Sequence, residues 1–524
     1  MGRRAPFARV VASAVAVATV AMAACTEPGV HTESAREGPT ASDPPADTQP
    51  PETAPANTEP PETEPPDTEP PATATASSLP PDEASDTAGD SLLADLGSAD
   101  LDVQAYDVRL TYDPASRQLD GTVTISTAVA RAVDELVLDA GELTVEAVSL
   151  DGAPVEFTHE AEAAELVIAP GERVGPASAS QPVEIAITYR DEAGAVPSSG
   201  LSPEGWFPTD TGSYVLNEPD GAHTWMPAND HPSDKATWRF ELTVPDGTAA
   251  IANGHLVEQR EGPDGDTWVW EQREPMATYL VQLLTGDYEV LDGGTAGDTP
   301  LVNVALSRDV ERMQPYFDLT DDQIEYFEPL FGPYPLDQYG LAFTESFPGL
   351  AMETQGRSLF SREDFTSDEP GLIQQLLLAH ELAHQWFGNA VTPADWSDLW
   401  LNESFATYAQ WLWLDHVGLW DLEAQAEANL RQRQRPTEPT GEPTRGNLFG
   451  YERYDGGAVV LHALRGVLGD GAFFELLQRW VADNDGASRT TADFIELAEE
   501  IGHQQLDDFF DTWLYADALP AEYP

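Results

Sequence analysis

Two histidines stand four residues apart in the segment His380-Glu-Leu-Ala-His384. Residues with this spacing lie on one face of an α-helix, so both imidazoles can reach a single cation, and Glu381 lies about 100° around the helix. The alternative is a pair of structural histidines in an apolar stripe with Leu377 and Phe387. Two buried imidazoles without partners are costly, so the segment predicts a helix that binds metal.

A third ligand is predicted at Glu403, which follows His384 after eighteen intervening residues, in the segment Trp400-Leu-Asn-Glu-Ser-Phe-Ala406. Its neighbours in this segment are mostly apolar, so the carboxylate is expected in a packed element. Two histidines and one carboxylate leave a fourth position open, which is typical of catalytic rather than structural zinc. One Zn²⁺ per chain is therefore predicted, with Glu381 placed to take a proton from a water molecule that the metal activates.

The charge balance excludes several classes of function. The chain has 92 acidic and 25 basic side chains among 524 residues, a net charge of −67, and its only lysine is Lys235. No basic surface for nucleic acid or for electrostatic binding to a membrane is expected from this composition. A hydrophobic content of 41% is too high for a wholly disordered chain, and a single cysteine forms no intrachain disulfide.

Residues 1–25 have the pattern of an export signal. Arginines near the start precede an apolar run over residues 10–24, which is too short for a membrane span, and small residues lead to Cys25. This pattern resembles a bacterial lipoprotein signal, in which the cysteine carries lipid, although Met22 stands where leucine is usual. The resemblance implies a protein held by lipid on Cys25 at the extracytoplasmic face of the cell membrane; the alternative is plain secretion with Cys25 incidental.

Residues 26–97 are rich in proline, threonine and acidic side chains, and Thr58 to Ala72 repeats a five-residue unit. Proline removes hydrogen-bond donors and like charges repel, so an extended, disordered tether is expected. A proline-rich docking ligand is the alternative, but the segment lacks basic or aromatic anchors.

The remaining chain divides into a β half at residues 98–305 and an α-rich half at residues 306–524. Alternating apolar and polar residues predict antiparallel strands in the first half, and Asp-Gly pairs are typical of its turns. Strands are expected at 106–112, 121–126 and 183–189, turns at 120–121, 151–152, 246–247 and 264–265, and helices near 371–387, 398–417, 452–468, 471–483 and 491–501.

The zinc-binding pattern resembles that of the gluzincin zinc aminopeptidases, the family of aminopeptidase N and the leukotriene hydrolase. Gly349-Leu-Ala-Met-Glu-Thr354 is similar to the family's Gly-Ala-Met-Glu-Asn segment, with Leu350 and Thr354 as departures. Tyr454-Asp-Gly-Gly-Ala is similar to its Tyr-x-Lys-Gly-Ala segment, with Gly456 in place of the lysine.

This resemblance implies an α+β multidomain protein, in which an antiparallel β-sandwich-like domain precedes a thermolysin-like zinc peptidase domain. It further implies that Tyr454 stabilises the tetrahedral intermediate. Glu353 would bind the free N-terminal amine of a peptide substrate, and Glu218, in Asn217-Glu-Pro, would assist from the β domain. Larger members of the family continue into a helical C-terminal domain, which this chain is expected to lack.

Two other functions remain open. A zinc endopeptidase of the thermolysin type would share the metal site but would have no use for the segment around Glu353. A catalytically impaired, peptide-binding lipoprotein would explain the departures at Leu350, Thr354 and Gly456, but retention of the three zinc ligands, the base and the tyrosine argues against it.

Overall fold

The computed structural model describes residues 87–196 and 203–524. The predicted signal, its Cys25 and residues 26–86 of the predicted tether lie outside the described residues. Within the described part of the chain, no helix combines the length and the apolar character that crossing a membrane requires.

The last part of the predicted tether is folded, so the prediction is wrong for residues 87–97. Leu93 is 3% exposed and Leu96 is 9% exposed, and both belong to the core of the β half. The Asp90 carboxylate accepts hydrogen bonds from the backbone nitrogens of Leu92, Leu93 and Trp396, at 2.7–2.8 Å. Apolar burial and these bonds compensate for the entropy of ordering the segment, which composition alone did not reveal.

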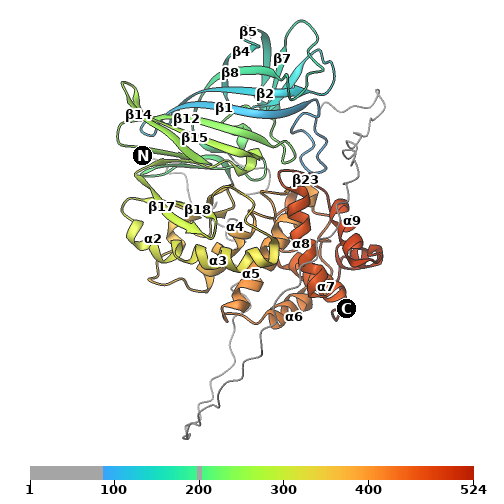
Figure 1. The fold of residues 1–524 in the computed structure, drawn as a ribbon. Coiled ribbons are helices and arrows are strands. Elements are labelled where there is room, and N and C mark those ends of the chain that lie inside the picture. The colour runs from blue at the N-terminus through green and yellow to red at the C-terminus, as the bar shows by residue number, and fades with distance from the viewer. Residues whose placement is uncertain (1–86, 197–202) are drawn as a thin grey trace, which may run out of the picture. The chain divides into compact units, whose positions relative to one another are not determined.

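The β half is built on an eight-stranded sheet with the order β14-β15-β12-β1-β2-β8-β4-β5 (Figure 1). Burial alternates along its strands as the period of two requires, for example in β12. Neighbouring strands are antiparallel except β1 and β12, which pair in parallel. Its strands are β1 (Leu101–Asp113), β2 (Gln118–Val129), β4 (Thr144–Leu150), β5 (Ala153–Pro154), β8 (Val183–Glu192), β12 (Ala236–Val244), β14 (His255–Gly262) and β15 (Gly265–Met276).

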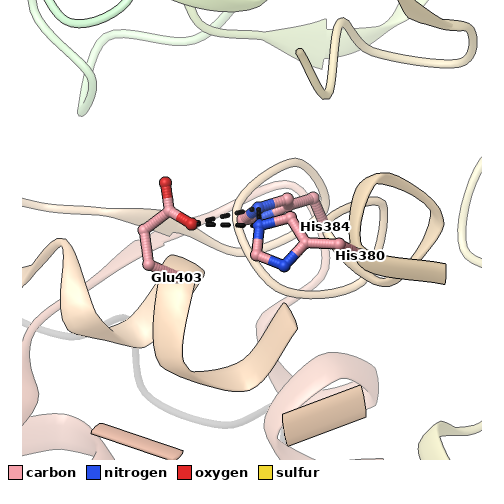
Figure 2. Close-up of side chains that lie close together, drawn as sticks. All are labelled: His380, His384 and Glu403. Atoms are coloured by element: carbon pink, nitrogen blue, oxygen red, sulfur yellow. Dashed lines mark hydrogen bonds and ion pairs between the residues drawn. The ribbon is translucent and has the colours of Figure 1, made fainter. Parts of the chain in front are cut away.

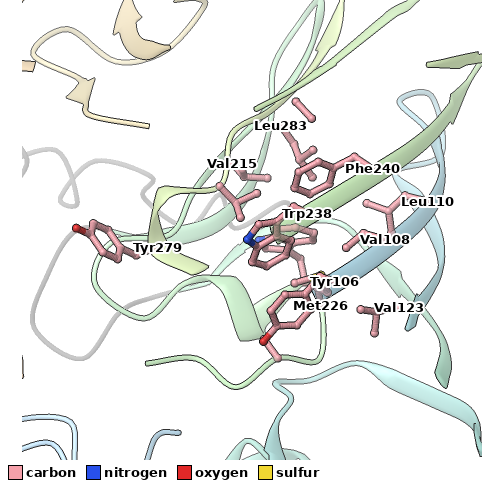
Figure 3. Packing of buried hydrophobic residues seen from close by; sticks show 14 of the residues in the cluster. Tyr106, Val108, Leu110, Val123, Val215, Met226, Trp238, Phe240, Tyr279 and Leu283 are labelled. Atoms are coloured by element: carbon pink, nitrogen blue, oxygen red, sulfur yellow. The ribbon is translucent and has the colours of Figure 1, made fainter. Parts of the chain in front are cut away.

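Two smaller sheets complete the β half, and a common apolar core lies among its strands. In that core Tyr106 stacks on Trp238, with ring centroids 4.0 Å apart, and Trp238 stacks on Phe240 (Figure 3). A five-stranded sheet has the order β13-β16-β11-β10-β9 and a three-stranded sheet the order β3-β7-β6. Their strands are β3 (Leu136–Asp139), β6 (Glu156–Glu160), β7 (Glu165–Ala169), β9 (Ala195–Val196), β10 (Glu204–Pro208), β11 (Gly212–Leu216), β13 (Ala249–Ala252) and β16 (Leu283–Gly286).

One of the four predicted Asp-Gly turns is wrong. Asp120 and Gly121 lie inside β2, where Gly121 pairs with Leu110 on one side and Tyr189 on the other. A Cβ atom on Gly121 would lie 2.4 Å from the ring of Tyr189. The glycine is therefore required by a side chain that packs across it, and not by a reversal of the chain.

A fourth sheet crosses the predicted boundary at residue 305. Its order is β17-β18-β19-β21-β20, and β18 pairs in parallel with β19 of the following half. By strand pairing, the boundary falls between β16 and β17 and not after residue 305. Its strands are β17 (Tyr288–Ala296), β18 (Thr299–Leu306), β19 (Leu341–Thr344), β20 (Ala351–Met352) and β21 (Ser358–Ser361), and a separate small pair is β22 (Thr392–Pro393) with β23 (Ser488–Arg489).

The α-rich half contains all five predicted helices, so the α+β class and the order of the two halves are confirmed. The first of them is shorter than expected, because the chain leaves the helix after Ala383 and turns back at residues 387–391. The helices are α2 (Val310–Phe317), α3 (Leu319–Phe331), α4 (Leu372–Ala383), α5 (Trp400–His416), α6 (Leu422–Arg433), α7 (Asp455–Leu468), α8 (Asp470–Asn484), α9 (Thr491–Gly502) and α10 (Asp507–Trp513).

Candidate zinc site and substrate-binding residues

The predicted metal ligands come from two helices that pack against each other, α4 and α5. The first turn of α4 is closed by the backbone N–H of Gly371, which donates to Gln374 Oε1 at 3.0 Å. His380 and His384 lie at the end of α4, Glu403 lies in the first turn of α5, and none of the three is more than 7% exposed. Figure 2 shows one Glu403 oxygen facing both imidazole rings.

The spacing of the three ligand atoms fits a tetrahedral zinc ion. Nε2 of His380 lies 3.1 Å from Nε2 of His384, and Glu403 Oε2 lies 3.2 Å from the first and 3.5 Å from the second. Zinc bonds of about 2.0–2.2 Å place neighbouring ligand atoms about 3.3–3.6 Å apart. The three donors, 3.1–3.5 Å apart, are therefore within about 0.2 Å of the separation that one shared zinc ion requires.

Hydrogen bonds on the far side of each ring set the tautomer that metal binding needs. Nδ1 of His380 lies 3.1 Å from Gln410 Oε1, and Nδ1 of His384 lies 3.1 Å from the carbonyl oxygen of Phe387. Both acceptors favour a proton on Nδ1, which leaves both Nε2 lone pairs directed at the same space. Two lone pairs at this distance repel each other unless a cation lies between them.

Burial and charge make this site attractive to a cation. Burial raises the pKa of Glu403, but hydrogen bonds from His380 and His384 outweigh it and bring the pKa to about 2. Burial lowers the pKa of His384, but the carboxylates of Glu353, Glu403 and Glu381 outweigh it and raise the pKa to about 10. A dication at this position would replace the proton that these carboxylates otherwise hold on His384.

The carboxylate groups of Glu381, Glu353 and Glu218 lie in the same cluster. Donor atoms of Glu353, Glu381 and His384 lie within 4.8 Å of one another. Burial raises the pKa of Glu381 and of Glu353, and it raises the pKa of Glu218, with Glu353 and Glu403 as the next causes. Oε1 of Glu353 and Oε1 of Glu218 are buried and have no hydrogen-bond partner among the described residues. Such acceptors are costly unless a cationic donor reaches them.

Tyr454 lies directly before α7, so it is not inside the helix predicted at 452–468. Its hydroxyl donates a hydrogen bond to Glu403 Oε1 at 2.9 Å, and its ring lies parallel to that of His380 with centroids 6.1 Å apart. Close packing with α5 holds this end of α7, because a Cβ atom on Gly457 would lie 1.7 Å from Ser404 Oγ. Only glycine lets α7 approach the metal-binding helix so closely.

The structure shows which residues surround the three positions that depart from the family pattern. Leu350 is buried in the apolar core, and Thr354 accepts a hydrogen bond from Gln282 Nε2 of the β half at 2.9 Å. At Gly456, a Cβ atom would lie 3.3–3.4 Å from the Cδ and Nε atoms of the buried Arg433. A guanidinium from α6 thus lies beside the position at which the family carries lysine.

The structure brings the seven predicted residues to one place, and their individual roles remain predictions. Sequence reasoning missed Gln410, which orients His380; its signal was a position seven residues after Glu403 on the same helix face. It also missed Asn389, whose Nδ2 donates to the Glu353 carbonyl at 2.7 Å, and Tyr279, whose hydroxyl donates to the Gly388 carbonyl at 3.1 Å. Neither of these two has a sequence signal, because both act through the folded turn that follows α4.

A helix pair that supplies two histidines and one glutamate with an open position defines a catalytic type of zinc site. Residues 316–513 match the Peptidase family M1 domain, and residues 103–280 match the Peptidase M1 N-terminal domain. The chain belongs to peptidase family M1, and its cofactor is zinc.

Similar proteins include solved structures and a curated sequence. An M1 zinc metallopeptidase variant from Deinococcus radiodurans, bound to a Tyr-Ser-Ala substrate, is 30% identical with a TM-score of 0.73, covering 84% of this chain and 99% of that chain. A two-domain M1 zinc metallopeptidase variant bound to L-tryptophan is also 30% identical, with a TM-score of 0.74 and the same shares. Probable aminopeptidase 2 of Sulfurisphaera tokodaii is 27% identical over 413 residues, 74% of this chain and 51% of that protein. The chain spans about half the length of the curated relatives it matches.

Proposed function

We propose that this protein is a zinc-dependent aminopeptidase that removes N-terminal residues from peptides. The observation that carries the proposal is the pair of buried, unpartnered carboxylate oxygens of Glu353 and Glu218 beside the zinc ligands. An α-ammonium group at a fixed distance from the scissile bond is the cation that such a pair would select. The M1 metallopeptidase that was solved with Tyr-Ser-Ala supports a peptide as the substrate class.

When bound by His380, His384 and Glu403, the zinc ion supplies a polarised water and a Lewis acid for the scissile carbonyl. Glu381 is the general base, because its carboxylate lies within the same cluster and no hydrogen bond of its side chain competes for it among the described residues. It takes a proton from the attacking water at a carboxylate oxygen and passes it to the departing amine nitrogen.

The Tyr454 hydroxyl donates a hydrogen bond to Glu403 Oε1, so it already points toward the proposed metal ligands. Burial raises the pKa of this hydroxyl well above the ordinary value, which keeps it a neutral donor at every working pH. In the reaction the hydroxyl would stabilise the oxyanion that develops on the scissile carbonyl.

The two alternative functions predict different properties for the same residues. A zinc endopeptidase would need no unpaired carboxylates at the amine position, and it would accept blocked peptides. A peptide-binding lipoprotein would need no general base, yet Glu381 lies beside a complete set of zinc ligands.

N-terminal acetylation of a substrate is expected to abolish efficient cleavage, because it removes the charge that Glu353 would pair with and adds bulk at the same place. A hydrogen bond to a charged group is worth roughly 1.5–3 kcal/mol. Glu353→Ala should therefore lower kcat/KM for aminoacyl fluorogenic amides by about ten- to a hundredfold or more. Glu218→Ala should cause a smaller loss of the same kind.

Zinc content of both variants, measured by metal analysis, should stay stoichiometric because neither residue is among the proposed ligands. Internal cleavage of acetylated peptides as fast as free ones would identify an endopeptidase. A zinc-loaded protein that cleaves neither form would instead support the peptide-binding lipoprotein.

We further propose that lipid on Cys25 anchors the enzyme at the extracytoplasmic face of the cell membrane. The support is the sequence of residues 1–25, in which the only cysteine follows the small residues of an export signal. The native protein should partition into the detergent phase of a Triton X-114 separation, and Cys25→Ser should move it to the aqueous phase with unchanged kcat/KM. If the native protein stays fully in the aqueous phase, Cys25 carries no lipid, and residues 1–25 are an export signal for secretion alone.

A further inference from the structure

The turn at residues 387–391, which follows α4, is held by side chains of the β half. Within it, three consecutive carbonyl groups, those of Gly388, Asn389 and Ala390, accept hydrogen bonds from Tyr279 and Lys235. The turn also needs glycine, since Gly388 has a φ of +125° and its Cβ would lie 3.4 Å from Nδ1 of His384. A segment next to a zinc ligand is thus fixed by the other half of the molecule.

Lys235 is the only lysine of the chain, and it is partly buried directly before β12. Its Nζ donates to the carbonyl of Asn389 at 2.7 Å and to that of Ala390 at 3.1 Å. Burial lowers its pKa to about 7, against the opposing effect of Asp485. Even partial burial of an ammonium group against neutral carbonyls is costly. An uncharged side chain would pack at this position at a lower cost. The lysine therefore indicates a role other than apolar packing.

Tyr279 makes the second contact. Figure 3 shows it at the margin of the labelled core residues, with its hydroxyl directed away from Trp238. That hydroxyl donates to the Gly388 carbonyl at 3.1 Å and accepts from Asn402 Nδ2 at 3.3 Å. Asn402 directly precedes the zinc ligand Glu403, so Tyr279 links the turn to the start of α5.

The same turn also contacts a predicted zinc ligand and the residue proposed to bind the substrate amine. The Asn389 backbone N–H donates to the His384 carbonyl at 3.0 Å, and its side-chain Nδ2 donates to the Glu353 carbonyl at 2.7 Å. The Phe387 carbonyl lies 3.1 Å from Nδ1 of His384. One residue, Asn389, is therefore bonded at once to Lys235, to a zinc ligand and to the residue proposed to bind the amine.

We propose that Lys235 is a positioning residue that sets the distance between the zinc ion and the amine-binding carboxylate of Glu353, acting through Asn389. The inference rests on the proposed function, because it assumes that Glu353 binds the α-amine of the substrate. Loss of the Lys235 contacts would leave the metal ligands on α4 and α5 in place but would free the turn that holds Glu353. Recognition of the amine should suffer, while zinc binding should not.

The test compares two zinc-chelating inhibitors that differ only in the α-amine, leucine hydroxamate and 4-methylpentanohydroxamate. The ratio of their inhibition constants measures amine recognition separately from chelation. We expect a ratio of at least about tenfold in the native full-length protein. Lys235→Met should lower the ratio by about tenfold, with the constant of the amine-free compound and the zinc content both within about threefold of native.

Two further variants keep the test decisive where Lys235→Met fails to fold. Asn389→Ala retains the backbone groups that bind Lys235 but removes the bond to Glu353, so it should lower the same ratio. The matched control is Thr211→Val, which removes a different contact between the halves, the 2.6 Å hydrogen bond to Glu345 Oε2. It should leave the ratio unchanged.

The outcomes separate the inference from the function beneath it. If the ratio of the two inhibition constants in the native protein is near one, Glu353 does not bind the amine. That result would contradict both the proposed aminopeptidase function and the positioning role of Lys235. A large native ratio that persists in Lys235→Met and in Asn389→Ala would overturn the positioning role alone. An equal loss in Thr211→Val would also overturn it, because the cause would then be general loosening between the halves.

Discussion

Replacing Glu381 by glutamine is expected to leave zinc bound and to lower kcat by at least about a hundredfold. General acid–base catalysis by a positioned side chain contributes about 10²–10⁴ to the rate, and the amide cannot accept the proton. The substitution preserves the shape of a side chain that is buried, with Glu381 5% exposed, so the fold should not change. The measurements are kcat on an aminoacyl amide and the zinc content of the same preparation.

Glu496→Gln is the matched control for this substitution, because Glu496 is exposed on α9 and lies outside the candidate site. It should retain native kcat. If kcat of Glu381→Gln stays within a few fold of the native value, Glu381 is excluded as the general base, even if zinc remains stoichiometric.

Removal of a metal ligand is expected to abolish both zinc binding and activity. In His384→Ala or Glu403→Ala, only two protein ligands remain, and the buried carboxylates around them lose the cation that offsets their charge. A chelator should produce the same inactive state in the native protein, with activity restored by added Zn²⁺. Metal analysis and kcat/KM on the same samples provide the readout.

The matched control is His503→Asn, since His503 is exposed and has the left-handed backbone conformation that asparagine tolerates. This variant should keep zinc and activity. Stoichiometric zinc in the His384→Ala protein would contradict the ligand set, because His384 belongs to both groups of residues that could hold a metal ion.

The grouping of the three predicted zinc ligands could be predicted because the sequence pattern that indicates it is local. The helical spacing of His380 and His384 places them on one face wherever the helix lies, and Glu403 follows in the next long helix. The contacts that orient these ligands were not predictable in the same way. Gln410 has a helical signal, whereas the carbonyl of Phe387 becomes a partner of His384 only because the helix ends earlier than its apolar pattern suggests.

The errors in the β half have one physical cause, which is long-range packing that overrides local propensity. Asp120-Gly121 is a typical turn pair, yet the ring of Tyr189 requires glycine inside the strand. Residues 87–97 follow a proline-rich segment, yet Leu93 and Leu96 are buried against strands far along the chain. The parallel pairing of β1 with β12 likewise depends on a partner that no local pattern indicates.

The sheet that joins the two halves has a consequence for dividing the molecule into fragments. A catalytic fragment that begins at residue 306 would lose β17 and most of β18, and β19 would be left with a free edge. All four residues of β19 are buried in the intact protein, so the exposed edge would be an apolar template for intermolecular pairing. A fragment that starts before Tyr288 keeps the sheet whole, and it is the shortest piece with which autonomous folding of the catalytic half can be tested without provoking aggregation.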